Sequence, residues 1–254
     1  MNERRLRKEV IDVCARIHQK GWVANHDGNI SVRLGDNRLL ITPTAMSKGD
    51  ITEEMLLVVD MTGKKLFGSR KPFSELNLHL AAYRARPEIA AVLHAHPPTA
   101  TGFAVAGIPL SPPFLPEVVV SLGAEIPTAP FAMPGTPESE AAVADALRHC
   151  HVFLLENHGA LSVGESIQQA YLRMELVEHY AKINLVALQL GSVQTLSPPQ
   201  VETLLEKHRK AGLAPPGQAE TPPPPCSARS SHPSGVGEDL KEIISREIAR
   251  VLKA

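Results

Sequence analysis

Three histidines stand where two apolar stretches of the sequence end, and their spacing suits a metal ion. His94 and His96 are separated by one residue at the end of a predicted strand. Side chains at positions i and i+2 point to the same side of a strand, so both imidazoles can reach one ion. His158 ends a second apolar stretch, and Gly159 after it allows a sharp turn towards the same point. Three histidines with an open fourth position are typical of a catalytic divalent-metal site.

One carboxylate is placed where it could move protons beside such an ion. Glu75 follows Ser74 at the start of a predicted helix over 74–84, in which Ser74 would be the N-cap and Glu75 would lie in the first turn. His79 lies on the same helix face and could support the site or have a purely structural role. A favourable interaction of Glu75 with the helix dipole would explain its position equally well.

Two polar turns, over 25–31 and 42–45, could bind a phosphate group through backbone N–H and hydroxyl groups. Ordinary surface turns have the same composition, so the residues alone leave both interpretations open. The other histidines that we considered are expected to be surface or structural residues: His26, His149, His151 and His208.

The elements that would position these residues alternate irregularly between helix and strand. Helical spacing predicts helices at 6–17, 74–84, 98–106, 138–148, 166–190 and 198–211, and apolar or alternating runs predict strands at 29–34, 39–42, 56–60, 89–94, 152–156 and 160–163. The turn at 35–37 joins the first two strands as a hairpin. This order favours a layered α/β domain with a mixed or largely antiparallel sheet.

Composition excludes several classes of function. Of the 254 residues, 43% are hydrophobic, which rules out wholesale disorder, and the formal net charge of −1 provides no basic field for nucleic acid. A run of about 18 apolar residues, which a membrane span would need, is missing from the sequence. Three scattered cysteines form neither a disulfide framework nor a zinc motif, so we expect a reducing, cytoplasmic location.

The C-terminal part has a different composition from the rest. Seven of the 22 prolines lie in residues 212–237, which predicts an extended linker. Residues 238–254 then carry an apolar stripe at helical spacing, formed by Leu240, Ile243, Ile244, Ile248, Val251 and Leu252. This helix could pack on its own domain or oligomer, or dock on another protein. A membrane-surface helix is disfavoured, because four acids balance four bases and Trp and Phe are missing from it.

Several motifs together resemble the class II aldolase/adducin family, and within it the L-fuculose 1-phosphate type of aldolase. The matching segments are 28–33, 41–44, 74–75 with His79, 94–96 and 157–160, and the resemblance extends from about Glu3 to Leu213. It implies a three-layer α/β/α fold with a mainly antiparallel central sheet, assembled as a homotetramer. Two departures stand out: Ala45 replaces a glycine, and Phe73 replaces a serine that would supply a phosphate-binding hydroxyl.

The resemblance also implies roles for individual residues. It assigns His94, His96 and His158 as metal ligands, with Zn²⁺ as the expected ion, and Glu75 as the catalytic acid/base. The phosphate of the substrate would be held by Gly28, Asn29, Thr44, Ala45 and Ser74. Glu117 lies near the position of a family tyrosine that donates a proton, and it could substitute in that role.

The implied activity is metal-dependent cleavage of a ketose 1-phosphate to dihydroxyacetone phosphate and an aldehyde such as L-lactaldehyde. Alternatives within the fold are a pentulose-5-phosphate 4-epimerase, a ketose-1-phosphate dehydratase and a non-catalytic, adducin-like binding head. A Schiff-base aldolase would need a buried lysine, and the candidates Lys48 and Lys182 do not lie in a predicted strand core.

The expected organisation is therefore a catalytic domain at 1–211, a linker at 212–237 and an amphipathic targeting helix at 238–254. This C-terminal arrangement resembles the encapsulation peptides of enzymes housed in bacterial microcompartments. It implies a shell protein as a partner, whereas nucleic acid and membrane are not expected as partners.

Overall fold

The computed structural model describes residues 2–35, 37–110 and 112–216, and these residues belong to one compact unit. The predicted helix at 238–254 and nearly all of the predicted linker lie outside the described residues. Within the described part, the helix α7 (Pro198–Lys210) ends one residue before the expected boundary of the catalytic domain.

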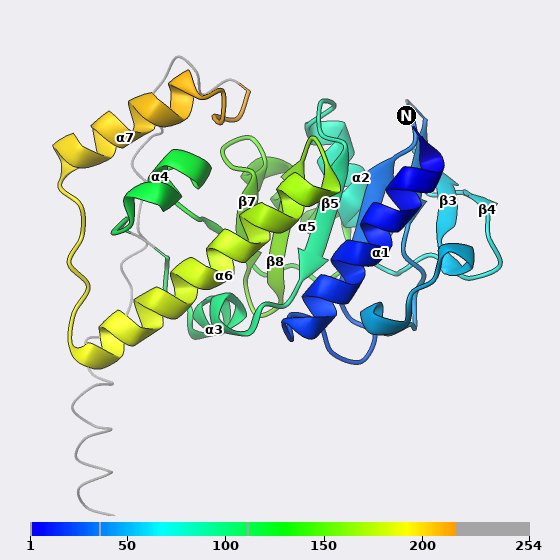
Figure 1. Ribbon diagram of the computed structural model, residues 1–254, viewed down its shortest axis with the longest axis horizontal. Helices are drawn as coiled ribbons and strands as arrows, with labels where there is room; N and C mark the ends of the chain where they lie inside the picture. The colour runs from blue at the N-terminus through cyan, green and yellow to red at the C-terminus, as the bar shows by residue number, and fades with distance from the viewer. Residues whose placement is uncertain (1, 36, 111, 217–254) are drawn as a thin grey trace, which may run out of the picture. The chain divides into compact units, whose positions relative to one another are not determined.

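A single sheet of eight strands forms the centre of the described unit (Figure 1). The strand order is β4-β3-β2-β1-β5-β8-β7-β6. Every neighbouring pair is antiparallel except β6 and β7, which confirms the mainly antiparallel sheet. The strands are β1 (Asn29–Arg33), β2 (Arg38–Ile41), β3 (Leu57–Asp60), β4 (Lys65–Phe67), β5 (Ala91–Ala95), β6 (Thr128–Ala129), β7 (Val152–Leu155) and β8 (Gly159–Gly164).

Helices cover both faces of the sheet, as the expected three-layer fold requires. Along β5, Leu93 packs in a cluster with residues of α1, α3 and α6, whereas its neighbour Val92 packs in a second cluster with residues of α2 and α5. Because successive side chains of a strand point to opposite faces, the two clusters are the two sides of the sheet. The helices are α1 (Glu3–Gln19), α2 (Leu76–Ala85), α3 (Pro98–Ala106), α4 (Pro116–Leu122), α5 (Pro137–Ala146), α6 (Ile167–Leu190) and α7, with the short 3₁₀ helices η1 (Lys48–Asp50) and η2 (Glu53–Met55).

The two long helices follow the apolar spacing read from the sequence. In α1, the five buried apolar residues Leu6, Val10, Val13, Cys14 and Ile17 share one face, and each contributes roughly 1–3 kcal/mol by burial. In α6, the Ser166 side chain accepts a hydrogen bond from the backbone N–H of Gln169, 3.2 Å away, and the helix ends at Gly191. The predicted hairpin is present as β1 and β2. The short elements β4, β6 and α4 were not predicted.

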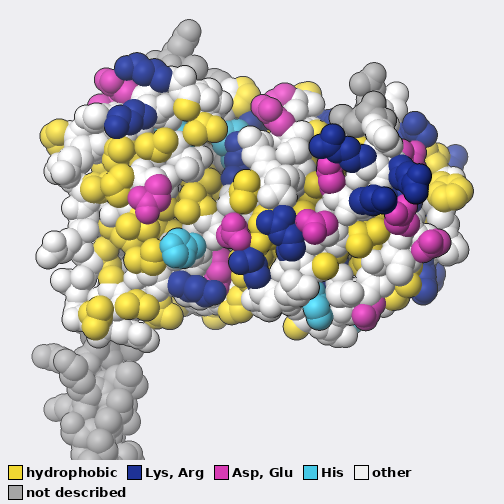
Figure 2. Space-filling model, in the orientation of Figure 1, with side chains coloured by type: hydrophobic (Ala, Val, Ile, Leu, Met, Phe, Trp, Pro, Cys, Tyr) yellow, Lys and Arg dark blue, Asp and Glu magenta, His cyan; other side chains and the backbone are white. Residues whose placement is uncertain are grey.

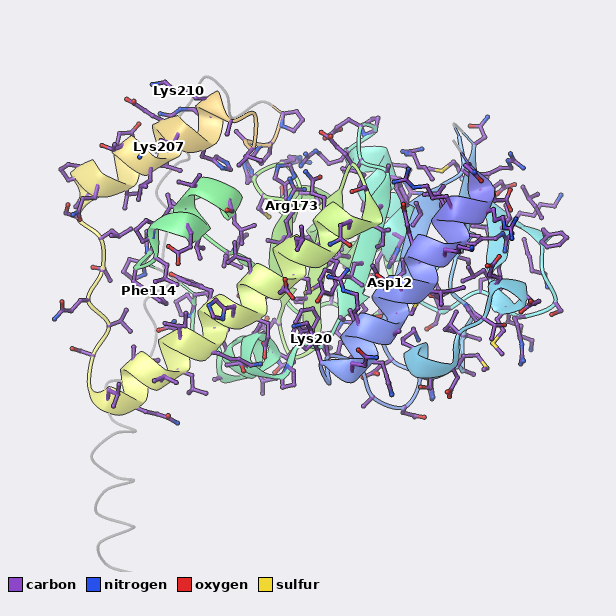
Figure 3. The ribbon with its side chains drawn as sticks, in the orientation of Figure 1. Asp12, Lys20, Phe114, Arg173, Lys207 and Lys210 are labelled. Carbon is purple, nitrogen blue, oxygen red and sulfur yellow. The ribbon has the colours of Figure 1, made fainter. Side chains whose placement is uncertain are left out.

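The surface shown in Figure 2 is divided between charged and apolar regions. Apolar side chains gather over the C-terminal half of α6 and its neighbours, and charged side chains dominate over α1. Exposed apolar residues of α6 and α3 are Leu172, Leu185, Val186, Leu188, Leu190 and Val105. Beside this region Phe114 stacks on Tyr180 of α6, with ring centroids 4.2 Å apart (Figure 3). Among the described helices, none is long and apolar enough to cross a membrane.

His151 and Arg86 form a buried polar contact that does not involve His94, His96 or His158. Arg86 donates to Nδ1 of His151 over 3.3 Å, and Nε2 of His151 donates to the carbonyl of Leu213 over 3.0 Å. Burial, assisted by the charges of Arg173 and Arg86, lowers the pKa of His151 to about 3. The prediction of a structural role for His151 therefore fits its surroundings.

This lowered pKa predicts a loss of stability on acidification. Between pH 7 and pH 5 the unfolded chain takes up a proton at His151 and the folded chain does not, so the free energy of unfolding falls, by roughly 2 kcal/mol for this one group. Urea unfolding at the two pH values should show a smaller fall in His151→Gln, because glutamine can make both hydrogen bonds and does not titrate. An equal pH dependence in the variant would contradict this account.

Candidate metal centre

The strand β5 brings His94 into the interior beside the sheet. His94 pairs with Asn29 of β1 and Leu161 of β8 in the ladder, and it is only 1% exposed. Its Nδ1 lies 2.9 Å from the carbonyl oxygen of Ala160, so the Nδ1–H donates to that carbonyl. Burial lowers the pKa of His94 to about 4, which keeps the imidazole neutral at neutral pH. Its Nε2 is therefore available as a ligand with a free lone pair.

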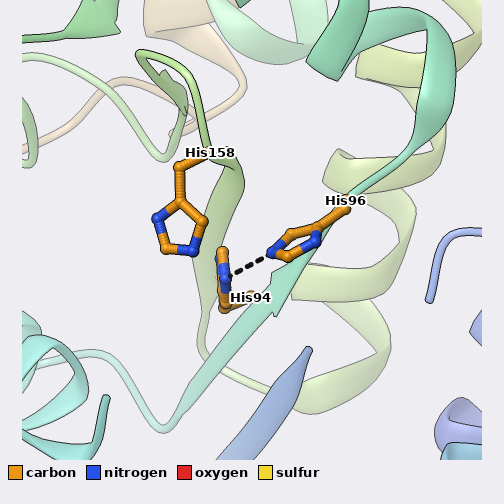
Figure 4. A group of neighbouring side chains, drawn as sticks. All are labelled: His94, His96 and His158. Atoms are coloured by element: carbon orange, nitrogen blue, oxygen red, sulfur yellow. Dashed lines mark hydrogen bonds between the residues drawn. The ribbon is translucent and has the colours of Figure 1, made fainter. Parts of the chain in front are cut away.

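His96 and His158 complete a triad around one point (Figure 4). The Nε2 atoms of His94 and His96 are 3.1 Å apart, and Nδ1 of His96 lies 3.0 Å from Oδ2 of Asp27. One ligand nitrogen from each of the three histidines lies within 4.8 Å of the other two. The structure thus brings together the three histidines that the sequence spacing predicted as a group.

The chemistry of the two inner nitrogens fits a bound cation. When Nδ1 of His94 donates to Ala160 and Nδ1 of His96 donates to Asp27, two Nε2 lone pairs face each other across 3.1 Å. Two acceptors at this distance repel unless a proton or a metal ion lies between them. Tetrahedral Zn²⁺ with Zn–N bonds of about 2.0–2.1 Å would separate two ligand nitrogens by about 3.3 Å. The residues present therefore fit a divalent metal ion.

The helix α2 places Glu75 against the same histidines. Its Oε1 lies 3.0 Å from Nε2 of His158 and its Oε2 lies 3.6 Å from Nε2 of His94. The expected capping arrangement is wrong: α2 begins at Leu76, Glu75 occupies the N-cap position without a side-chain bond to the helix, and Ser74 is not the cap. The carboxylate turns away from the helix and towards the imidazoles instead.

The charge of Glu75 is stabilised in spite of its burial. Burial by itself would raise its pKa, but the imidazoles of His94 and His158 and the amide of Asn29 hold the pKa well below its usual range. Glu75 is therefore a carboxylate at neutral pH, which is the form that can accept a proton.

A chain of hydrogen-bonded polar side chains supports Glu75. Asn29 donates through Nδ2 to Oε2 of Glu75 over 2.8 Å, and its Oδ1 lies 2.6 Å from Nε2 of His79. Nδ1 of His79 lies 2.7 Å from the hydroxyl of Ser31, which in turn lies 3.0 Å from the hydroxyl of Tyr83. His79 thus supports Glu75 through Asn29. Neither the role of Tyr83 nor the link between Asn29 and Glu75 is indicated by any local sequence pattern.

Three loops that carry the candidate phosphate-binding residues are joined to one another near Glu75. The N–H of Thr44 donates to the carbonyl of Lys71 over 3.0 Å, in the loop that leads to Ser74. The Nζ of Lys48 donates to the carbonyl of His26 over 3.2 Å, which ties the loop before Gly28 to the loop after Thr44. Gly28 and Ala45 both have positive φ, of 67° and 56°. Ala45 thus adopts a left-handed backbone conformation that glycine adopts more easily, and a glycine stands at this position in the family that the sequence resembles.

Gly159 lets the strand β8 approach the ligands closely. A Cβ at this position would lie 2.5 Å from Cδ2 of His96 and 2.7 Å from the carbonyl oxygen of Ala95. Cβ atoms in proteins essentially never lie this close to another atom. The carbonyl of Ala95 belongs to the backbone of β5, so it could move away only by distorting that strand.

We therefore expect Gly159→Ala to displace the ligands and to destabilise the fold by about 1–3 kcal/mol. Metal affinity should fall at least about 10-fold, which competitive titration against a chromophoric chelator would measure. Gly102→Ala is the matched control, because a Cβ there meets no other atom within 4 Å. Equal metal affinity in the two variants would show that β8 does not set the ligand positions.

Two further candidates from the sequence are the proton donor Glu117 and the Schiff-base lysine Lys48. Glu117 is exposed near the start of α4, whose buried residues belong to the cluster on the α1 and α6 side of the sheet, opposite α2. Lys48 is buried, and its ammonium donates to the carbonyls of His26 and Met46. Burial lowers the pKa of Lys48, but these two bonds occupy the amine that a Schiff base would need.

Comparison with known proteins defines the class to which this fold and site belong. Residues 8–185 match the family described as Class II Aldolase and Adducin N-terminal domain, and the chain belongs to this family. It is accordingly an enzyme of the aldolase type, with the α/β fold of that family.

Particular relatives differ in their reactions. The L-fuculose phosphate aldolase of Escherichia coli O6:H1 (strain CFT073) is 33% identical over 214 residues, which cover 84% of this chain and 98% of that one. The 3-oxo-tetronate 4-phosphate decarboxylase of Escherichia coli K12 is 35% identical over 185 residues, covering 71% and 86%. The structure of YgbL from Escherichia coli, named as a candidate aldolase, epimerase or decarboxylase, has a TM-score of 0.73 and 32% identity, with 79% and 97% coverage.

Proposed function

We propose that this chain cleaves a ketose 1-phosphate, such as L-fuculose 1-phosphate or a similar 6-deoxyketose phosphate, to dihydroxyacetone phosphate and an aldehyde such as L-lactaldehyde. One observation carries the proposal: three imidazole ligands and one ionised carboxylate converge on a single point beside the sheet. Similarity to a fuculose phosphate aldolase over 98% of that protein's length supports the choice of substrate class.

A divalent ion held by His94, His96 and His158 would supply Lewis-acid stabilisation of the charge that develops on the substrate's carbonyl oxygen. The three nitrogen ligands suit Zn²⁺, which we propose as the ion.

The chain's own residues would position the substrate and move a proton. Cleavage breaks the C3–C4 bond and leaves its electron pair on C3, next to the C2 carbonyl. The C4 hydroxyl loses its proton as the aldehyde forms, and the ionised Glu75 would take up a proton in exchange by way of solvent. Glu75 would then deliver a proton to C3 to complete dihydroxyacetone phosphate, and it would remove that proton in the synthetic direction. Asn29 would keep the carboxylate aimed at C3. The joined loops with Gly28, Asn29, Thr44, Ala45 and Ser74 would hold the phosphate through backbone N–H, amide and hydroxyl groups.

Decarboxylation of a 3-oxo sugar-acid phosphate is a second candidate. The similarity to a 3-oxo-tetronate 4-phosphate decarboxylase, 35% identical over 71% of this chain, specifically favours it. Both reactions break a carbon–carbon bond next to a carbonyl and leave its electron pair on carbon, so one metal-and-carboxylate site can serve either.

Product analysis separates the candidates. The metal-loaded chain would be incubated with a panel of ketose 1-phosphates, pentulose 5-phosphates and 3-oxo-tetronate 4-phosphates. Release of triose phosphate and an aldehyde from a ketose 1-phosphate supports the aldolase. Release of CO₂, formation of an isomer or loss of water would instead identify a decarboxylase, an epimerase or a dehydratase. A chain that turns over none of these substrates would contradict the proposal.

We also propose a homotetramer. The exposed apolar side chains of α6 and α3 support it, because they form a surface that a neighbouring copy could cover. In such an assembly the exposed Glu117 of one copy could reach the site of the next. Sedimentation velocity would test the assembly state.

For the C-terminal region we propose a linker at 212–237 and a docking helix at 238–254 that binds a microcompartment shell protein. The support is the sequence alone: an apolar stripe behind a proline-rich segment. Deleting residues 238–254 should abolish co-purification with a co-expressed shell protein and leave turnover unchanged. Loss of turnover or of the tetramer on deletion would instead indicate docking on its own subunits.

A further inference from the structure

A carboxylate that the mechanism above does not use touches one metal-ligand candidate. Oδ2 of Asp27 lies 3.0 Å from Nδ1 of His96, the ring nitrogen that does not face His94. The sequence pattern places Asp27 only within a polar turn. Its partner His96 is the ligand candidate that most needs a support, because its side chain is 26% exposed whereas that of His94 is 1% exposed.

Hydrogen bonds within the turn around Asp27 fix the orientation of this carboxylate. Its other oxygen, Oδ1, accepts a hydrogen bond from the N–H of Ala24 over 2.5 Å, and its own N–H donates to the carbonyl of Ala24 over 3.1 Å. Asn25 takes a positive φ of 50° inside the turn. The ammonium of Lys48 holds the neighbouring carbonyl of His26. Both carboxylate oxygens are therefore engaged, one by the turn and one by His96.

A carboxylate on the outer nitrogen of a metal-binding histidine has two consequences. It fixes the proton on Nδ1, so that Nε2 presents its lone pair to the ion, and it holds the ring in one orientation. It also makes the imidazole a stronger donor, because negative charge on the far side compensates the charge drawn to the metal. His94 receives only a neutral carbonyl in the equivalent place, so the two adjacent histidines are supported differently.

We propose that Asp27 is a positioning residue that orients and strengthens His96 as a metal ligand, without contacting the ion itself. This inference rests on the metal site of the proposed function. It predicts that the charge of Asp27, and not only its hydrogen-bonding shape, sets how tightly the ion is held.

The test compares metal affinity in full-length variants. The chain is stripped with a chelator and titrated with Zn²⁺ against a chromophoric competitor, and a parallel titration with Co²⁺ records the visible absorption bands. Asp27→Asn keeps an acceptor for Ala24 and removes the charge, and Asp27→Ala removes both. The matched control is Asp60→Asn, because Oδ1 of Asp60 accepts from the N–H of Thr62 over 2.9 Å in a turn away from the site.

We expect Zn²⁺ affinity to fall about 10-fold in Asp27→Asn and up to about 100-fold in Asp27→Ala, with altered Co²⁺ bands and no change in Asp60→Asn. Thermal unfolding of the metal-free proteins checks that each is folded, and Asp27→Asn decides the matter if Asp27→Ala does not fold. Affinities within twofold of the unsubstituted chain would overturn the proposal. So would a loss as large as that in His96→Ala, which would make Asp27 a ligand.

The two proposals fail in different ways. A native chain that binds no Zn²⁺ or Co²⁺ would overturn the metal-dependent function and this inference with it. A native chain that binds the ion, with both Asp27 variants binding equally well, would overturn the role of Asp27 alone.

Discussion

Replacing His94 with alanine is expected to lower kcat/KM for ketose 1-phosphate cleavage by at least about 10³-fold, because a metal ion stabilises a developing charge by several kcal/mol. His94 is the most deeply buried of the three ligand candidates and lies within reach of the other ligands and of Glu75. Its loss would leave two histidines, too few for a tightly held catalytic ion. Zn²⁺ binding should fall together with activity.

Chelation should have the same effect on the unchanged chain, and returning Zn²⁺ should restore turnover. His179→Ala is the matched control, since His179 is exposed on α6, on the opposite side of the sheet from α2. Turnover is measured by coupling triose phosphate release to a reporter enzyme. Full activity in the stripped chain or in His94→Ala would rule out the metal mechanism.

The part of the site that sequence could predict has local causes. His94 and His96 share one side of β5 because side chains alternate along a strand. Its position after another apolar strand links His158 to them, and the antiparallel pairing of β7 with β8 and of β8 with β5 brings it there. The triad thus follows from strand periodicity and from strands that end at one place.

The rest of the site depends on contacts between distant parts of the chain. Asn29 and His79 are separated by 50 residues, and only the packing of α2 on β1 makes them a support for Glu75. The local capping preference of Ser74 also predicted the wrong start for the helix α2. Ser74 is a good capping residue, but the sequence does not show that the imidazole of His158 interacts with the neighbouring Glu75 carboxylate.

Tertiary context explains the short elements that were missed. The segment 118–120 consists of three valines, which favour a strand, yet it lies in α4. Pro116 at the first turn and Gly123 after the last favour a helix there. His208 of α7 also donates to the carbonyl of Val120 over 2.8 Å, so that packing against α7 overrides the intrinsic preference.

Glu75→Gln should lower the turnover number by about 10²–10⁴-fold, the range in which a positioned acid or base contributes to a rate. Glutamine keeps the size of the side chain and an oxygen that can accept from Asn29, so the loops and the histidine triad should stay in place. It cannot exchange a proton with carbon. Zn²⁺ affinity should change far less than turnover, which distinguishes this variant from His94→Ala.

The proton step of Glu75 can be observed without cleavage. A site that forms dihydroxyacetone phosphate by protonating one carbon must also remove that proton, so the native chain should exchange it for deuterium in D₂O, as followed by NMR. Glu75→Gln should abolish this exchange, whereas Glu140→Gln should not, because Glu140 is paired with Arg84 at the surface. Undiminished exchange in Glu75→Gln would move the proton step to another residue and leave Glu75 only a role in holding the histidines.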